Sequence, residues 1–188
     1  MQDLFEYLSS FGPLSRPCKD FIAEHAVLRE VADQEHLLRI GDFSKHVYFI
    51  RKGLFRGYCR HNDLRKNIWF MAENDVMIAI GSFYTRQPSL EGIQALEKSE
   101  VYALSRVNLD LLYEIQPEFN LIGRKITERY YLKSLPDMER LRFLKGKERV
   151  IHFRDRCPEI FYRVPTAHLA SYLGLSLSSF YRVEPKKK

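Results

Sequence analysis

The chain has 188 residues, of which 45% are hydrophobic and 29% charged, a balance typical of a folded protein that excludes an intrinsically disordered one. No apolar run approaches the ~18–20 residues that a membrane span needs, and no basic start with an apolar block marks a secretory leader. We therefore expect no membrane partner. The three cysteines (Cys18, Cys59 and Cys157) are odd in number and far apart, which predicts a reducing, cytoplasmic location with neither a disulfide framework nor a metal site.

The positive charge is concentrated near the carboxyl end. The chain has 30 Lys or Arg against 24 Asp or Glu, and residues 137–188 hold 12 of the former and 6 of the latter. The first 136 residues are therefore neutral, and the last 52 carry the whole net charge of +6. A basic excess confined to one segment is the electrostatic pattern expected for binding phosphates; the alternative is a solvated basic surface.

The first half of the chain predicts two short helices followed by a β-roll. Apolar residues recur at helical intervals over residues 1–24, broken by Pro13 and Pro17. From Ala26 to Ser105 the pattern changes to short runs rich in β-branched and aromatic residues, separated by turn formers. The eight runs are VLREV, HLLRI, VYFIRK, LFRGYCR, RKNIWF, VMIAI, GIQALE and EVYAL. Their even spacing predicts an antiparallel barrel or jelly roll, which can enclose a ligand cavity.

Helical spacing returns after the roll. We predict one helix over Val107–Ile115, a long one over residues 117–144 and a third over Lys147–Cys157. Pro136 is expected to kink or break the long helix. Its apolar stripe predicts pairing with a second copy of the chain, although the stripe could instead pack on its own barrel. The stripe consists of Phe119, Ile122, Ile126 and Tyr130.

The segment TAHLASYLGLSLSSFYRV, residues 166–183, has the pattern of a helix-turn-helix. Ala170 allows a close helix crossing, and Gly174 can take the left-handed conformation that ends one helix and reverses the chain. Thr166 and Ser176 are expected to cap the two helices. Such a unit holds its second helix in the major groove of DNA, whereas the alternative is a plain helical hairpin of the core.

The chain resembles the Crp/Fnr family of bacterial transcription regulators through GDFSKHVYFIRKGLFRGY and VPTAHLASYLGLSLSSFYR. The resemblance implies an α+β fold with a cyclic-nucleotide-binding type of roll over residues 1–116, a dimerisation helix over 117–144 and a helix-turn-helix domain over 145–188. It also implies DNA, a second copy of the chain and RNA polymerase as partners. Pro185 is expected to end the reading helix early, which predicts a DNA-binding domain that is short relative to the family.

The effector site departs from the pattern of the family's cyclic-nucleotide binders. Gly81 is retained, but Ser82 and Ser89 stand where those binders carry Glu and Arg, and Glu91 would repel a phosphate. This argues against cyclic AMP and leaves two alternatives, a pocket for another small effector or a vestigial pocket, with no cofactor implied. The candidate effector residues are Gly81, Ser82, Phe83, Arg86 and Ser89.

In the reading helix, Arg182 matches the family's DNA-contacting arginine and is the best candidate for a guanine or phosphate contact. Leu177 and Ser178 replace an Arg and a Glu that read bases in well-studied members, so the preferred sequence should differ. The candidate DNA contacts are Thr166, Ser176, Ser178, Ser179, Arg182 and Lys186.

The sequence thus predicts a dimeric, effector-responsive transcription regulator. The alternative is a small-molecule sensor or interaction module that has lost productive contact with DNA. An enzyme is not expected, because no catalytic nucleophile with its base, no metal-ligand spacing and no phosphate loop is visible. Asp137 and Glu139 are interpreted as solvated helix charges.

Overall fold

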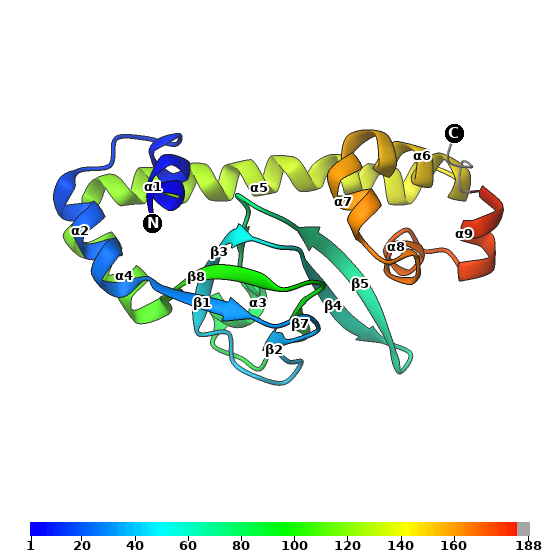
Figure 1. The fold of residues 1–188 in the computed structure, drawn as a ribbon, viewed down its shortest axis with the longest axis horizontal. Coiled ribbons are helices and arrows are strands. Elements are labelled where there is room, and N and C mark those ends of the chain that lie inside the picture. Colours follow the sequence, from blue (N-terminus) through cyan, green and yellow to red (C-terminus); the bar gives the residue numbers. More distant parts are fainter. Residues whose placement is uncertain (184–188) are drawn as a thin grey trace.

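The computed structural model describes residues 1–183, and the side chains of all of these except residues 137–142. A β-roll lies beneath one long helix, which connects helices at the amino end to a group of short helices at the carboxyl end (Figure 1). The helices are α1 (Gln2–Ser9), α2 (Arg16–His25), α3 (Ile80–Thr85), α4 (Arg106–Ile115), α5 (Pro117–Phe143), α6 (Gly146–Arg156), α7 (Pro158–Arg163), α8 (Thr166–Tyr172) and α9 (Leu177–Val183). None of them is long and apolar enough to cross a membrane.

The roll consists of two four-stranded antiparallel sheets. One sheet has the order β1-β8-β3-β6 and the other β2-β7-β4-β5. The strands are β1 (Val27–Val31), β2 (His36–Leu38), β3 (His46–Lys52), β4 (Phe55–His61), β5 (Leu64–Met71), β6 (Val76–Met77), β7 (Glu91–Ala95) and β8 (Ser99–Ser105). The predicted double-sheet roll is therefore confirmed, and each strand falls within or beside one of the eight predicted runs.

The β4–β5 hairpin extends from the roll toward the carboxyl-terminal helices (Figure 1). Asn62 and Asp63 both have positive φ, 47° and 59°, which is the backbone of the tight turn that matches strand twist. Gly57 of β4 lies under the Trp69 ring of β5, and a Cβ at that position would meet the ring at 2.0 Å. The missing side chain lets the indole lie flat across the neighbouring strand.

Helix α5 is anchored on its own roll. Phe119 and Ile122 are buried in a core shared with α1, α2 and α4, and Ile126 packs against that core. The Tyr130 hydroxyl donates to Asp75 Oδ1 at 3.0 Å and accepts from the Val76 backbone amide. These contacts fit the alternative interpretation, in which the stripe packs on its own roll, and pairing with a second copy stays a prediction.

The expected break at Pro136 does not occur. Pro136 lies inside α5, and the helix continues to Phe143. Proline removes one backbone hydrogen bond from the ladder, but the turns on either side keep theirs, so a 27-residue helix can survive the loss.

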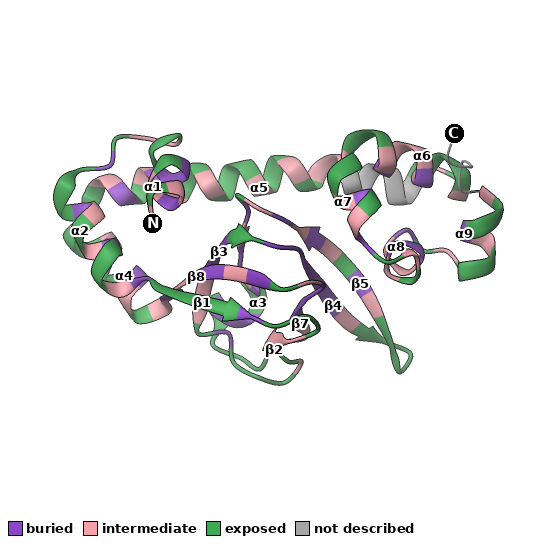
Figure 2. Ribbon diagram, viewed as in Figure 1, coloured by how far each residue is buried: buried purple, intermediate pink, exposed green. Residues whose placement is uncertain are grey.

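The carboxyl-terminal helices pack on the roll and share a core with it. Leu54, Phe70, Ala72 and Leu96 of the roll join one apolar cluster with buried residues of α6 to α9. In Figure 2, buried segments (purple) are visible on β4, β5 and α8. Phe153 of α6 and Tyr172 of α8 contact the Phe70 ring of β5. Apolar packing therefore joins the roll to the helices that follow it.

Candidate functional site

Helices α8 and α9 meet at a tight corner at Gly174. Gly174 has φ of +69°, and the Leu175 amide donates to the Ala170 carbonyl at 2.9 Å across the turn. This is the hydrogen bond of a left-handed helix end, which glycine adopts without steric cost. Ala170 is buried at the helix crossing, and Phe180 of α9 is fully buried beneath it in the same cluster.

Ser176 caps α9, as the sequence predicts, but Thr166 does not cap α8. The Ser176 hydroxyl accepts from the Ser179 amide at 3.1 Å and donates to the Ser179 hydroxyl at 2.8 Å. The N-cap of α8 is Pro165, whose carbonyl accepts from the His168 and Leu169 amides. The N-cap expectation for Thr166 was wrong because this residue already lies in the first turn.

The outer face of α9 carries the candidate DNA contacts. Ser178, Tyr181 and Arg182 are exposed, and Arg182 Nη2 donates to the Ser179 hydroxyl at 3.1 Å. The guanidinium therefore points away from the apolar core. Lys186, the remaining candidate, lies outside the described residues.

A cavity of about 680 Å³ lies between the roll, α5 and the carboxyl-terminal helices. Strands β3, β5 and β8 supply its floor, Gly123 to Ser134 of α5 line its other side, and α6, α7 and α8 contribute Phe153, Ile160 and Tyr172. The volume is that of a small-molecule site. Because both the roll and helices α6 to α8 line it, an occupant would contact both.

The lining is apolar and aromatic, with few charges. Glu91 accepts from Trp69 Nε1 at 3.1 Å, and burial raises the pKa of its carboxyl. Lys133 pairs with Asp75 at 3.2 Å, and Arg156 donates to the Lys133 carbonyl. The lining therefore differs from the cation-bearing site that a cyclic phosphate needs.

None of the five candidate effector residues lines this cavity. Ser82 and Ser89 are buried and hold the neighbouring loop: the Ser44 amide donates to Ser82 Oγ, and the Ser89 amide to the Asp42 carbonyl. Phe83 is buried in the amino-terminal core, whereas Gly81 and Arg86 are exposed.

The sequence missed α3, because VMIAI looks like a strand to its end. The structure places Ile80 and Tyr84 of α3 at the cavity, together with Trp69. The only local signal for them was the cluster of aromatic residues around the candidate effector residues 81–89.

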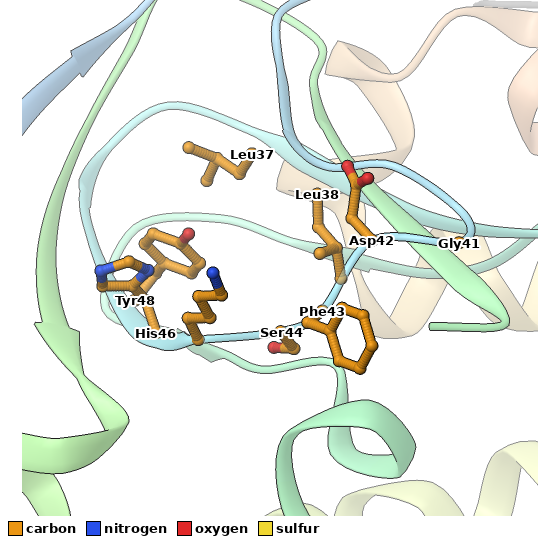
Figure 3. A pocket seen from close by; sticks show the side chains of 9 residues that line it. Leu37, Leu38, Gly41, Asp42, Phe43, Ser44, His46 and Tyr48 are labelled. Atoms are coloured by element: carbon orange, nitrogen blue, oxygen red, sulfur yellow. The ribbon is translucent and has the colours of Figure 1, made fainter. Parts of the chain in front are cut away.

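A smaller pocket of about 420 Å³ lies under the loop between β2 and β3. Figure 3 shows Asp42 beside Leu38 on this loop, with His46 and Tyr48 on the opposite side of the space. Burial lowers the pKa of His46, and the nearby Arg29 and Lys45 add to the effect. Among the described residues, no group of three or more His, Cys, Asp or Glu could hold a metal ion.

A buried polar network joins the roll to α8. The Arg56 guanidinium donates to Gln94 at 2.6 Å, to Asn67 at 2.9 Å and to His168 Nδ1 at 3.0 Å. The Asn67 amide donates to Ser171 Oγ at 3.2 Å. Since arginine can only donate, Nδ1 of His168 must be an acceptor here. Burial lowers the pKa of His168, and the charge of Arg56 adds to the effect.

An ion-pair clamp holds α7 to the roll. Arg163 donates to both carboxylate oxygens of Glu73, at 2.7 and 3.0 Å, and to Glu97 at 2.6 Å. Burial opposes ionisation of Glu73, but the Arg163 bonds and the Gly53 amide outweigh it and lower its pKa to about 2. The same contacts raise the pKa of Arg163. This forked geometry fixes orientation as well as distance.

Comparison with known proteins identifies the roll. Residues 28–115 match the cyclic nucleotide-binding domain. Among solved structures, FixK2 from Bradyrhizobium japonicum is 19% identical, with a TM-score of 0.67 over 84% of this chain and 82% of that one. The c-di-GMP responsive global regulator CLP of Xanthomonas campestris is 17% identical, with a TM-score of 0.68 over 90% and 89%.

The Thermus thermophilus Catabolite Activator Protein is 17% identical, with a TM-score of 0.59 over 94% of this chain and 84% of that one. A search of curated proteins finds no match. At these identities the structural similarity establishes the fold. The chain therefore carries a cyclic nucleotide-binding domain at residues 28–115, and as a whole it has the Crp/Fnr regulator fold that its sequence motifs predicted.

Proposed function

We propose that the chain is a dimeric, effector-responsive transcription regulator that reads the DNA major groove with α9. The observation that carries this proposal is the outward face of α9, held by the Gly174 corner and presenting Arg182 and Ser178 to solvent. A buried Phe180 fixes the helix from behind. This is how a recognition helix is presented to base edges.

Charge and the large cavity support the same proposal. The net charge of +6 belongs to residues 137–188, the part of the chain that contains α9. Basic side chains there would contact phosphates, while those on α9 would read bases. An effector in the cavity would touch the roll and α6 to α8 together. Its binding could therefore favour one placement of the reading unit over another.

The test is a DNA titration with the full chain. A duplex enriched from a random pool by the wild-type protein is titrated at about 50 and about 200 mM salt, and affinity should fall steeply with salt. Replacing Arg182→Ala should weaken binding roughly tenfold or more, the cost of one good base contact. The matched control is Arg16→Ala, an exposed arginine on α2 at the opposite end of the protein (Figure 1).

Affinity that ignores salt, or equal affinities for the Arg182 and Arg16 variants, would contradict DNA reading by α9. If no duplex is enriched while a small molecule still stabilises the protein against heat, the alternative of a sensor without DNA contact is favoured.

A further inference from the structure

The cavity of about 680 Å³ has the wrong chemistry for a phosphate-bearing effector. Within the described part of the chain its one acidic lining residue is Glu91, whose carboxyl already accepts from the Trp69 indole. A carboxylate beside a bound phosphate would repel it, and an isolated phosphate charge needs a cationic partner when it leaves water.

Two cations among the described residues line the cavity, and both have partners of their own. Lys133 of α5 pairs with Asp75 at 3.2 Å, and Arg156 of α6 donates to the Lys133 carbonyl. Arg86, one of the five candidate effector residues, is exposed and does not line the cavity. The lining residues contributed by β5, β7 and α3 thus include no arginine that could make the forked contact of a cyclic phosphate, and the one arginine of the described lining, Arg156, comes from α6.

The rest of the lining favours a flat, apolar ligand. Trp69 and Tyr84 face the space beside α3, Tyr130 and Tyr131 face it from α5, and Ile78 and Ile126 add aliphatic surface. Aromatic rings contribute large buried areas and stack on planar molecules. A volume of about 680 Å³ accepts a molecule of drug-like size.

We propose that this cavity binds an uncharged, largely apolar aromatic molecule, and not a cyclic nucleotide. The proposal rests on the proposed function, because it names the chemical class of the effector. The ligand would be buried between β5 and α5 and would contact Tyr172 of α8. It would therefore touch the roll and the carboxyl-terminal helices at the same time.

Two fluorescent dyes test the charge preference directly. Phenylnaphthylamine is neutral, and anilinonaphthalene sulfonate has the same rings with an added anionic group. The neutral dye should bind saturably, at one molecule per chain, and at least about tenfold more tightly than the sulfonate, the effect of one uncompensated charge. Cyclic AMP should displace neither dye. Replacing Glu91→Gln should narrow the gap between the dyes by strengthening sulfonate binding.

A matched pair of variants locates the dye. Thr127 lines the cavity on α5, whereas Lys125 of the same helix is exposed and does not line it. Thr127→Trp should fill the cavity and weaken binding of the neutral dye about tenfold, and Lys125→Trp should leave it unchanged. Circular dichroism and thermal unfolding confirm that both variants fold.

The proposal is overturned if the neutral dye fails to saturate, if both tryptophan variants bind it equally, or if cyclic AMP competes. The dye experiment contains no DNA, so its result is independent of the DNA titration. If the neutral dye binds but DNA affinity is the same with and without it, the proposed regulation is contradicted and the cavity assignment is not. If DNA binds but the dye does not, the cavity assignment is contradicted and DNA binding is not.

Discussion

Arg56 shows how one buried cation is satisfied without a carboxylate. Its side chain is only 7% exposed, and its neutral partners Gln94, Asn67 and His168 accept its hydrogen bonds. Burial lowers the pKa of Arg56, but a guanidinium remains charged at physiological pH. A proton on His168 would place a second positive charge beside it and remove the acceptor. The contact between β4 and α8 therefore depends on neutral His168.

This dependence predicts a loss of stability in mild acid. The pKa of His168 is lowered from 6.5 in the folded chain, so the unfolded chain binds more protons below pH 6.5. The contribution of neutral His168 to the free energy of unfolding should therefore have its full value above pH 6.5 and decrease as the pH drops below 6.5. Glutamine can accept from Arg56 but does not titrate, so His168→Gln should unfold in urea with a shallower pH dependence between pH 7 and 5.

His36 and His46 also have lowered pKa values, so His168→Gln should keep part of the pH dependence of the free energy of unfolding. Desolvation is the main cause at each, with smaller contributions from Arg39, Arg65 and Arg56 at His36 and from Arg29 and Lys45 at His46. Near pH 8 the wild type and the variant should agree within about 1 kcal/mol, because both side chains accept one hydrogen bond. Identical pH profiles for the two proteins would refute the role of His168.

Local chemistry explains which parts of the fold were predictable. The eight strands follow from alternating β-branched and aromatic runs, and the α8–α9 corner follows from Gly174 and Ser176, whose backbone preferences act within a few residues. Helices α3 and α7 were missed, since six residues each carry too little periodicity. The large cavity could not be predicted, because its lining comes from elements far apart in the sequence.

Helix α5 has two kinds of apolar residue, and only one kind is free for a partner. Phe119, Ile122 and Tyr130 are used by the chain's own roll. Leu132 and Phe143 are exposed, at 63% and 78%. They are eleven positions apart, about three full helical turns, so they lie on one face. For the proposed dimer we therefore expect the pairing seam nearer the carboxyl end of α5 than the sequence stripe suggested.

The proposed dimer should depend on this face. Light scattering at micromolar concentration should give twice the chain mass of 22.3 kDa for the wild type. Leu132→Lys should shift the mass toward a single chain, because a charge would be buried at the seam. Leu64→Lys makes the same change at an exposed leucine of β5 and should remain dimeric. A monomeric wild type, or two dimeric variants, would contradict this seam.

The roll and helices α6 to α9 are joined by three kinds of contact. An apolar cluster runs from Phe70 and Leu54 into α6 to α9, the Arg56 network meets α8, and the Arg163 clamp holds α7 to Glu73 and Glu97. Because the cluster is continuous, the two parts should unfold together. The clamp determines how α7, and with it the α8–α9 pair, is oriented on the roll.

Breaking the clamp should separate the two parts thermally. In calorimetry the wild type should show one unfolding transition. Arg163→Gln should show a separate, earlier transition for helices α6 to α9, with its midpoint temperature lowered by at least about 2–4 °C for each kcal/mol of lost contact. Arg154→Gln is the matched control: its partner, Asp155, lies on its own helix, so the change should leave a single transition. Two transitions in the wild type, or the same trace for both variants, would show that the clamp does not couple them. With the clamp in place the roll and helices α6 to α9 cannot shift independently. An effector bound between them, as proposed, would therefore change the position of α9 as well.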